Sequence, residues 1–137
     1  MKKNILSLFI GLVLTSKAQT FIGKNESEIK DLVKKNGYEF EYNDKDPQLG
    51  VSIFSYADTK LDRHYGFHYG KDGICFAYTI QTGDEISKNA VVKEIDKLAT
   101  EKISDNSWIQ KIDGKVYEWH MQSTNDFTSF STAEIKK

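Results

Sequence analysis

The chain has 137 residues and a nearly balanced charge, with 19 basic residues, 20 acidic residues and a formal net charge of −1. This length fits one compact domain that can bury a sizeable hydrophobic core. Positive and negative side chains are interspersed and form no basic patch, which argues against nucleic acid or an anionic membrane surface as a partner.

Residues 1–18 have the pattern of a signal peptide. Lys2 and Lys3 precede an apolar run over residues 5–14, and small residues suited to cleavage follow it. The run is about half as long as a helix that spans a membrane. We therefore expect cleavage before Gln19, no membrane insertion after the leader is removed, and an exported mature chain in the periplasm or outside the cell.

Cys75 is the single cysteine of the chain. An intramolecular disulfide is therefore impossible, even though an exported protein meets an oxidising environment. Cys75 also lies far from the apolar run of the leader, so the protein is not expected to be a lipoprotein. We expect residues 19–137 to form a single globular domain that is stabilised by packing alone.

Two amphipathic helices are expected. The first spans residues 26–36, because Asn25 and Glu28 have the spacing of a capping box and Asn36-Gly37 is a C-terminal stop signal. The second spans about 86–101, where apolar residues recur at helical spacing opposite a charged face. A helix with one apolar stripe must cover another apolar surface.

A sheet provides that surface. Aromatic residues alternate with other residues, at the period of a β-strand, in three segments. These segments are residues 38–42, 65–69 and 74–80. Further strands are expected at residues 51–56, 108–112, 115–122 and 127–132.

Turn residues indicate which strands pair. Asp113-Gly114 is a strong signal for a tight hairpin, and it sets Trp108 opposite Trp119. The turn at residues 70–73 joins a second hairpin, in a two-residue or a four-residue form; both put Tyr65, Phe67 and Tyr69 on the face of Ile74, Phe76 and Tyr78. The expected fold is α+β, a mostly antiparallel sheet of about six strands with two helices packed on one face; the order is α-β-β-β-β-α-β-β or the same order with one more strand, since two or three strands follow the second helix.

The histidines are the first candidates for chemistry. His64 and His68 share a strand face about 13 Å apart, which is too far to hold one metal ion together. No metal site and no cofactor are therefore expected. The alternative is a small enzyme or a haem-binding protein that uses Cys75, His68, His64 or His120. In that alternative, Cys75 and His68 lie opposite or diagonal to each other across the hairpin and form a thiolate–imidazolium pair.

Glu39 and Glu41 are a further pair with possible chemistry. They share a strand face about 7 Å apart, a separation that is compatible with the carboxylates of glycoside hydrolases. Their alternation with aromatic residues instead favours charges that face solvent.

The aromatic rows suggest the leading hypothesis for function. Most of these rings are expected in the core under the helices. Trp108, Trp119 and Tyr117 are the expected exception, as an exposed platform for a ligand. No complete catalytic set is visible, so the sequence favours a non-catalytic exported module that binds a protein, a peptide or a glycan, and an enzyme is the less favoured hypothesis.

Overall fold

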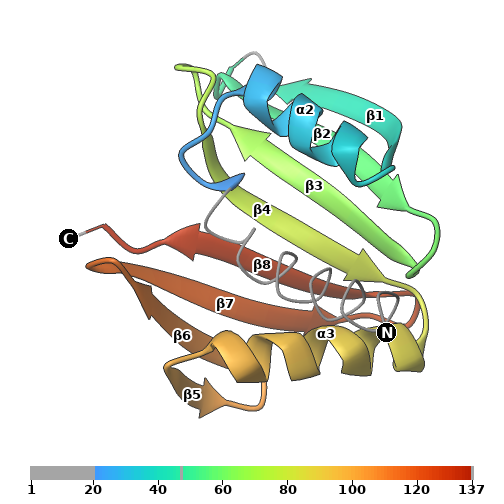
Figure 1. Ribbon diagram of the computed structural model, residues 1–137, viewed down its shortest axis with the longest axis vertical. Helices are drawn as coiled ribbons and strands as arrows, with labels where there is room; N and C mark the ends of the chain where they lie inside the picture. Colours follow the sequence, from blue (N-terminus) through green and yellow to red (C-terminus); the bar gives the residue numbers. More distant parts are fainter. Residues whose placement is uncertain (1–20, 47, 137) are drawn as a thin grey trace, which may run out of the picture.

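The computed structural model describes residues 21–46 and 48–136, and the expected signal peptide lies outside them (Figure 1). Within these described residues, two α-helices and eight β-strands follow one another. In chain order they are α2 (Glu26–Lys35), β1 (Glu39–Asp46), β2 (Val51–Asp58), β3 (Arg63–Tyr69), β4 (Cys75–Thr82), α3 (Glu85–Leu98), β5 (Glu101–Ser104), β6 (Ser107–Ile112), β7 (Lys115–Ser123) and β8 (Thr128–Glu134).

The eight strands form one antiparallel sheet in the order β1-β2-β3-β4-β8-β7-β6-β5. Each half of this sheet is a helix followed by four strands that pair consecutively, and the two halves join where β4 lies beside β8. The topology is therefore an internal repeat. Its consequence is that β1 and β5, the first strands of the two halves, form the two outer edges of the sheet.

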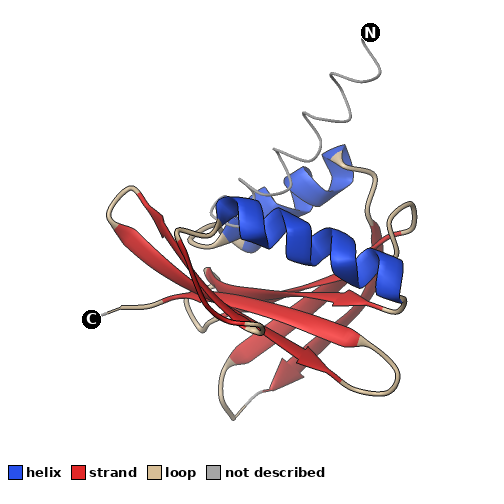
Figure 2. Ribbon diagram, turned by 90° about the horizontal axis from the view of Figure 1, so that it is seen from below, coloured by secondary structure: helices blue, strands red, loops and turns tan. Residues whose placement is uncertain are grey.

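Both helices lie on the same side of the sheet (Figure 2). The buried apolar residues of α2 are Ile29 and Val33, and those of α3 are Val91 and Ile95. They belong to one core together with the aromatic rings that the central strands direct toward the helices. We call this side of the sheet the helix side and the opposite side the open side.

Local sequence signals account for the helix ends. Asn25 accepts a hydrogen bond from the backbone N–H of Glu28 (2.9 Å), and Glu28 accepts one from the N–H of Asn25 (3.3 Å), which completes the expected capping box. Asp84 accepts a hydrogen bond from the N–H of Ser87 (2.6 Å) and caps α3 in the same way.

The α+β class and the antiparallel sheet are confirmed, but the expected number of about six strands is wrong. The additional strand in the second half is β5, which begins at Glu101, the residue expected to end the second helix. Ala99 leaves the helical conformation, with φ −65° and ψ 135°, and the chain turns into β5. The apolar stripe continues through this segment, so periodicity alone does not reveal the break. Pairing of β5 with β6 decides its conformation.

The sequence predicted the register of the β6–β7 hairpin correctly but not that of the β3–β4 hairpin. Trp108 lies opposite Trp119 as expected, and Asp113 and Gly114 have φ values of 51° and 79° in the turn between them. In the β3–β4 hairpin, a bulge shifts the register so that Tyr69 lies opposite Cys75 and His68 lies opposite Ala77. Tyr78 keeps the expected side, opposite buried Phe67, but Phe76 is 45% exposed and lies with His68, so the expected single row of Ile74, Phe76 and Tyr78 is wrong before the bulge. An extra residue in one strand shifts the alternation, so the side chains before the bulge point to the opposite side of the sheet.

Candidate binding site at the sheet edge

The three histidines lie on the open side of the sheet. His64 and His68 alternate with Tyr65, Phe67 and Tyr69, which point into the core, and His120 follows buried Trp119. His120 contacts Glu118, and its Nδ1 lies 3.2 Å from the hydroxyl of Ser107. The histidines therefore stay on separate parts of the sheet surface. Among the described residues, no group of three or more His, Cys, Asp or Glu side chains could hold a metal ion.

His64 is paired with Glu41 of the neighbouring edge strand. Its Nδ1 lies 3.0 and 2.9 Å from the two carboxylate oxygens, and Nδ1 carries the proton because a carboxylate only accepts. The hydroxyl of Ser55 donates to the same carboxylate at 3.0 Å. The carboxylate therefore separates the hydroxyl from the imidazole. This is the wrong order for a serine nucleophile, which needs the imidazole as its immediate neighbour.

Glu41 is the extra residue of a bulge in β1. The register with β2 shifts between Phe40 and Tyr42, while Glu39 lies opposite Ala57. The two glutamates therefore do not occupy a regular strand, which was the basis of the expected 7 Å carboxylate pair. Glu41 is instead engaged with His64 and Ser55.

Cys75 and His68 point to opposite sides of the sheet. Cys75 is 1% exposed and belongs to the core on the helix side, whereas His68 lies on the open side. Burial raises the pKa of the Cys75 thiol to about 12, and burial lowers the pKa of His68. Both groups are therefore held in their neutral forms at neutral pH. The bulge in the β3–β4 hairpin is the physical reason that the expected dyad does not assemble.

A small polar hollow lies on the open side beside the two histidines. It has a volume of about 210 Å³ and is bordered by His64, Gly66 and His68 of β3 and by polar side chains of neighbouring strands. A Cβ atom at Gly66 would lie 2.9 Å from the Thr79 hydroxyl, so a side chain at this position would displace that hydroxyl. The hollow therefore exists because β3 has a glycine between its two histidines.

The expected tryptophan platform lies in the core. Trp108, Trp119 and Tyr117 are all buried on the helix side, and the expectation of an exposed Trp pair is wrong. Trp108 Nε1 donates to Asp96 of α3 at 2.8 Å, and Trp119 Nε1 donates to Gln110 at 3.0 Å. The indole N–H groups are thus satisfied by the protein itself, through one acceptor on α3 and one on β6.

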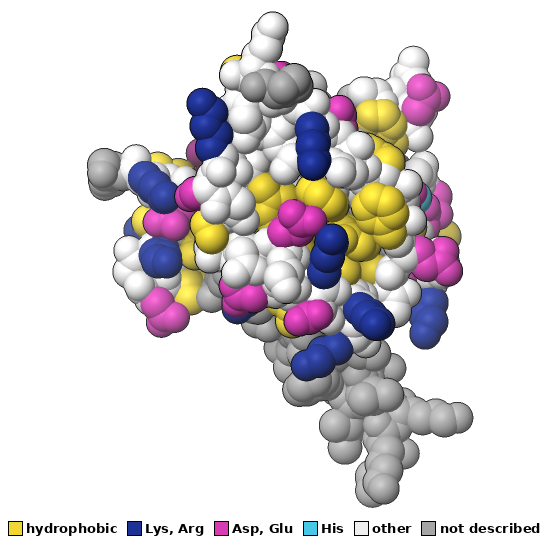
Figure 3. Space-filling view, turned by 90° about the horizontal axis from the view of Figure 1, so that it is seen from above, with side chains coloured by type: hydrophobic (Ala, Val, Ile, Leu, Met, Phe, Trp, Pro, Cys, Tyr) yellow, Lys and Arg dark blue, Asp and Glu magenta, His cyan; other side chains and the backbone are white. Residues whose placement is uncertain are grey.

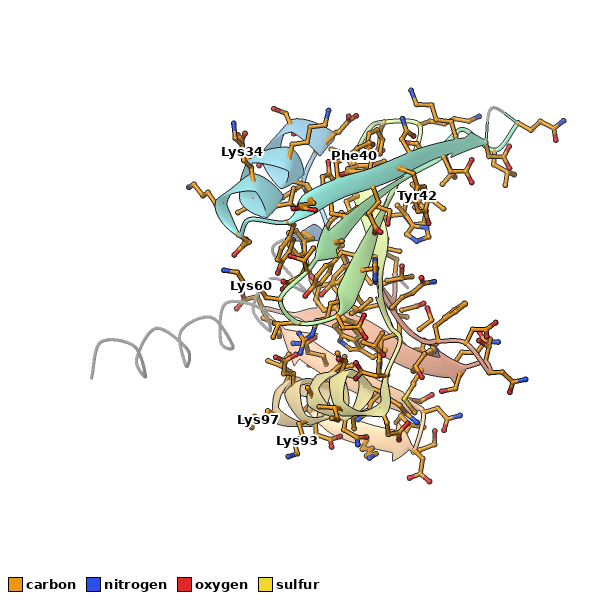
Figure 4. The ribbon with its side chains drawn as sticks, turned by 90° about the vertical axis from the view of Figure 1, so that its right-hand side faces the viewer. Lys34, Phe40, Tyr42, Lys60, Lys93 and Lys97 are labelled. Carbon is orange, nitrogen blue, oxygen red and sulfur yellow. The ribbon has the colours of Figure 1, made fainter. Side chains whose placement is uncertain are left out.

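Exposed aromatic surface occurs instead at the α2 end of the sheet. We call it the aromatic groove; it has a volume of about 480 Å³ and lies between α2 and the first two strands (Figures 3 and 4). Its lining residues are Lys30, Val33, Lys34, Gly37, Tyr38, Phe40, Phe54 and Tyr56. Figure 3 shows apolar side chains gathered at this end of the molecule, with charged side chains among them.

Phe40 is the most informative residue of the groove. It is 57% exposed, and its ring meets the buried ring of Tyr56 edge to face with 5.5 Å between ring centroids. Lys30 Nζ lies 5.7 Å from the ring centroid of Phe54, at the groove wall formed by α2. Lys30 also pairs with Glu26 at 3.1 Å. The groove therefore has an aromatic floor and lysine side chains along its helical border.

The sequence did not identify this groove. Tyr38, Phe40 and Tyr42 formed an aromatic row of the kind assigned to the core, and β1 was not known to be an edge strand. All residues of β1 whose side chains the structure describes are exposed. One sequence signal could have identified β1 as an edge strand. Glutamate and aspartate residues are interspersed with these rings along the segment, and charged side chains on both sides of a strand are typical of a sheet edge.

No family model, curated protein or solved structure matches this chain in the three comparisons. Within residues 21–46 and 48–136, no helix has both the length and the apolar composition needed to cross a membrane. The functional assignment therefore depends on the geometry of the chain itself.

Proposed function

We propose that the protein is an exported binding module that holds a protein or peptide partner at the aromatic groove and carries out no catalysis. The observation that carries this proposal is the large exposed fraction of Phe40 beside three further aromatic rings. Contiguous apolar surface of this kind on a soluble domain usually marks an interaction site. Aromatic rings are also enriched among the residues that dominate binding energies.

A peptide or protein fits this place better than a glycan. Sugars, peptides and proteins can all stack on exposed rings. This groove, however, runs beside β1, whose outer edge pairs with no described strand. Unpaired backbone N–H and C=O groups along a sheet edge are suited to another polypeptide.

The geometry supports catalysis less well. A working Cys75–His68 pair needs both groups on one side of the sheet, and the bulge separates them. A haem group would need an axial histidine in an apolar pocket. The three histidines instead border polar surface on the open side.

A photo-cross-linking residue placed at position 40 tests the binding function in the producing cells. We expect the variant to form a defined covalent product with one partner. Ile86 is a matched control, because it is 84% exposed and lies on α3 away from the groove. Identical products from positions 40 and 86, or none from position 40, would contradict the proposal.

The export part of the proposal is tested separately. Cell fractionation should recover the protein outside the cytoplasm, and sequencing of its N-terminus should begin at or near Gln19. Removal of residues 2–18 should retain it in the cytoplasm. Full-length protein found in the cytoplasm would contradict the proposed export. The binding function would then depend on the cross-linking test alone.

A further inference from the structure

β1 offers a regular stretch of backbone at the edge of the sheet. After the bulge at Glu41, residues 42–46 pair one to one with residues 55–51 of β2. No described strand lies on the other side of β1. In a strand, alternate N–H and C=O groups point to opposite edges, so this stretch presents a row of backbone groups outward.

The two sides of β1 carry opposite charge. Tyr42, Asp44 and Asp46 lie opposite Ser55, Ile53 and Val51, which places them on the open side. The helix side of the same stretch carries Asn43 and Lys45, opposite Phe54 and Ser52. The open side of this edge is therefore acidic, while its helix side is basic and continues into the aromatic groove.

The helix side also limits what an added strand can bring to it. Lys34 of α2 lines the groove beside Phe40, and Figure 4 shows both residues together with Tyr42 at this edge. Basic side chains on this side would face Lys34 and Lys45. Apolar side chains would instead cover the exposed ring of Phe40, so the apolar face of a strand fits here.

We propose that β1 accepts an extended segment of a partner protein as a ninth strand, in which basic and apolar residues alternate. The basic residues face Asp44 and Asp46, and the apolar residues lie on the aromatic groove. This inference rests on the proposed binding function and adds the mode of binding and the chemistry of the partner. Backbone hydrogen bonds supply the attachment, and the alternation of side chains supplies the specificity.

A second copy of this chain fits the edge less well. Two β1 strands side by side would place the acidic row of one copy along that of the other, and like charges in facing positions destabilise a strand pair. The charges of β1 thus disfavour pairing with β1 of a second copy of the chain, as in many natural edge strands. The same charges attract a basic strand.

The test uses the mature chain and the synthetic peptide acetyl-KVKFKVK-amide, with binding measured by fluorescence anisotropy of a labelled peptide. The control peptide acetyl-KKVFVKK-amide has the same composition and charge but no alternation. We expect it to bind at least about tenfold more weakly, because its basic and apolar residues cannot separate onto two sides. Equal binding of the two peptides would show charge attraction alone and overturn the proposal.

Two N-methylated forms of the alternating peptide test the backbone contacts. One form carries N-methyl groups on the valine and phenylalanine residues, and the other carries them on the lysine residues. Since alternate N–H groups point to opposite edges, one form should lose at least about tenfold in affinity while the other stays within about twofold. Equal effects of the two modifications would exclude strand addition.

Protein variants locate the contact. Asp44→Asn together with Asp46→Asn should weaken the alternating peptide at least about fivefold, and Phe40→Ser should weaken it similarly. Asp105→Asn is the matched control, because Asp105 is an exposed acid in the turn between β5 and β6. Unchanged affinity in the first two variants would overturn the proposal. Self-association through β1 in sedimentation, abolished by Phe40→Ser, would also overturn it and identify a second copy as the occupant.

The outcomes separate this inference from the proposed function. If neither peptide binds while position 40 still cross-links a partner in cells, strand addition fails and the binding module stands. If the alternating peptide binds with the expected pattern but position 40 captures no partner in cells, the edge has the inferred chemistry and the proposed function fails.

Discussion

A buried ion pair ties α3 to the sheet and gives the sharpest test of the packing. Arg63 of β3 is 3% exposed, and its Nη1 lies 2.7 Å from Oε2 of Glu94, whose side chain is 25% exposed. Neither Nη1 nor Nε makes an aligned hydrogen bond to a described residue. The 2.7 Å approach is therefore mainly a contact between charges, and the guanidinium depends on Glu94 for compensation.

Replacement of Glu94 by Gln should destabilise the protein by about 2–3 kcal/mol. Removal of one partner from a fully buried ion pair costs about 3–5 kcal/mol, because the remaining charge stays buried without compensation. A quarter of the Glu94 side chain is exposed, so water can solvate part of the site in the variant. This exposure is the reason that we expect a smaller cost.

The double variant Arg63→Met, Glu94→Leu should recover most of this loss. It removes both charges and keeps apolar volume, so its free energy of unfolding should be within about 1 kcal/mol of the unmodified protein. The poor hydrogen bonding of Arg63 strengthens this expectation, because few hydrogen bonds offset the free energy that desolvation of the guanidinium costs.

Equilibrium unfolding in urea, followed by tryptophan fluorescence, measures these differences. Glu85→Gln is the control, because its exposed pair with Lys88 should contribute less than about 0.5 kcal/mol. A cost below about 1 kcal/mol for Glu94→Gln would refute the reasoning that the buried guanidinium depends on this carboxylate. A double variant as unstable as the single one would refute the claim that desolvation dominates.

Local geometry gives four further predictions. Iodoacetamide should modify Cys75 about a thousandfold more slowly in the native protein than in urea at pH 8, since its pKa is about 12 rather than 9.0; comparable rates would show that the thiol is accessible. Because the unfolded chain loses this proton first, stability should fall as the pH rises from about 9 to about 12, which urea titrations at several pH values would detect. Gly114→Ala should cost about 1–2 kcal/mol in urea unfolding, because φ is 79° at this turn residue. Asn25→Ala should cost about 1 kcal/mol through loss of the capping box, and Ser27→Ala, which leaves that box intact, should cost less in the same assay.

Features with a strictly local cause were predictable from the sequence. Asn25 and Glu28 begin α2 because both halves of the capping box lie within four residues. Asp113-Gly114 forms a tight turn because these residue types tolerate positive φ. The pairing of Trp108 with Trp119 then follows by counting from that turn.

Features set by distant partners were not predictable. The bulges at Glu41 and in the β3–β4 hairpin depend on how a strand fits its neighbour, and each reverses the facing of the side chains beyond it. The bulge in the hairpin separates Cys75 from His68. The bulge in β1 sets Glu41 against His64 and leaves the next residues of the edge regular.

The sequence by itself determined the tight turn between β6 and β7 and the start of α3. Each of these features depends on residues within a few positions of one another. The tertiary structure decided which aromatic rings meet solvent. Trp119 and Phe40 both belong to alternating rows. Trp119 lies on an inner strand and is buried under α3, whereas Phe40 lies on the outermost strand, where α2 borders its ring but leaves it 57% exposed. Burial depends on the position of a strand in the sheet, and that position is set by pairing between segments far apart in the chain.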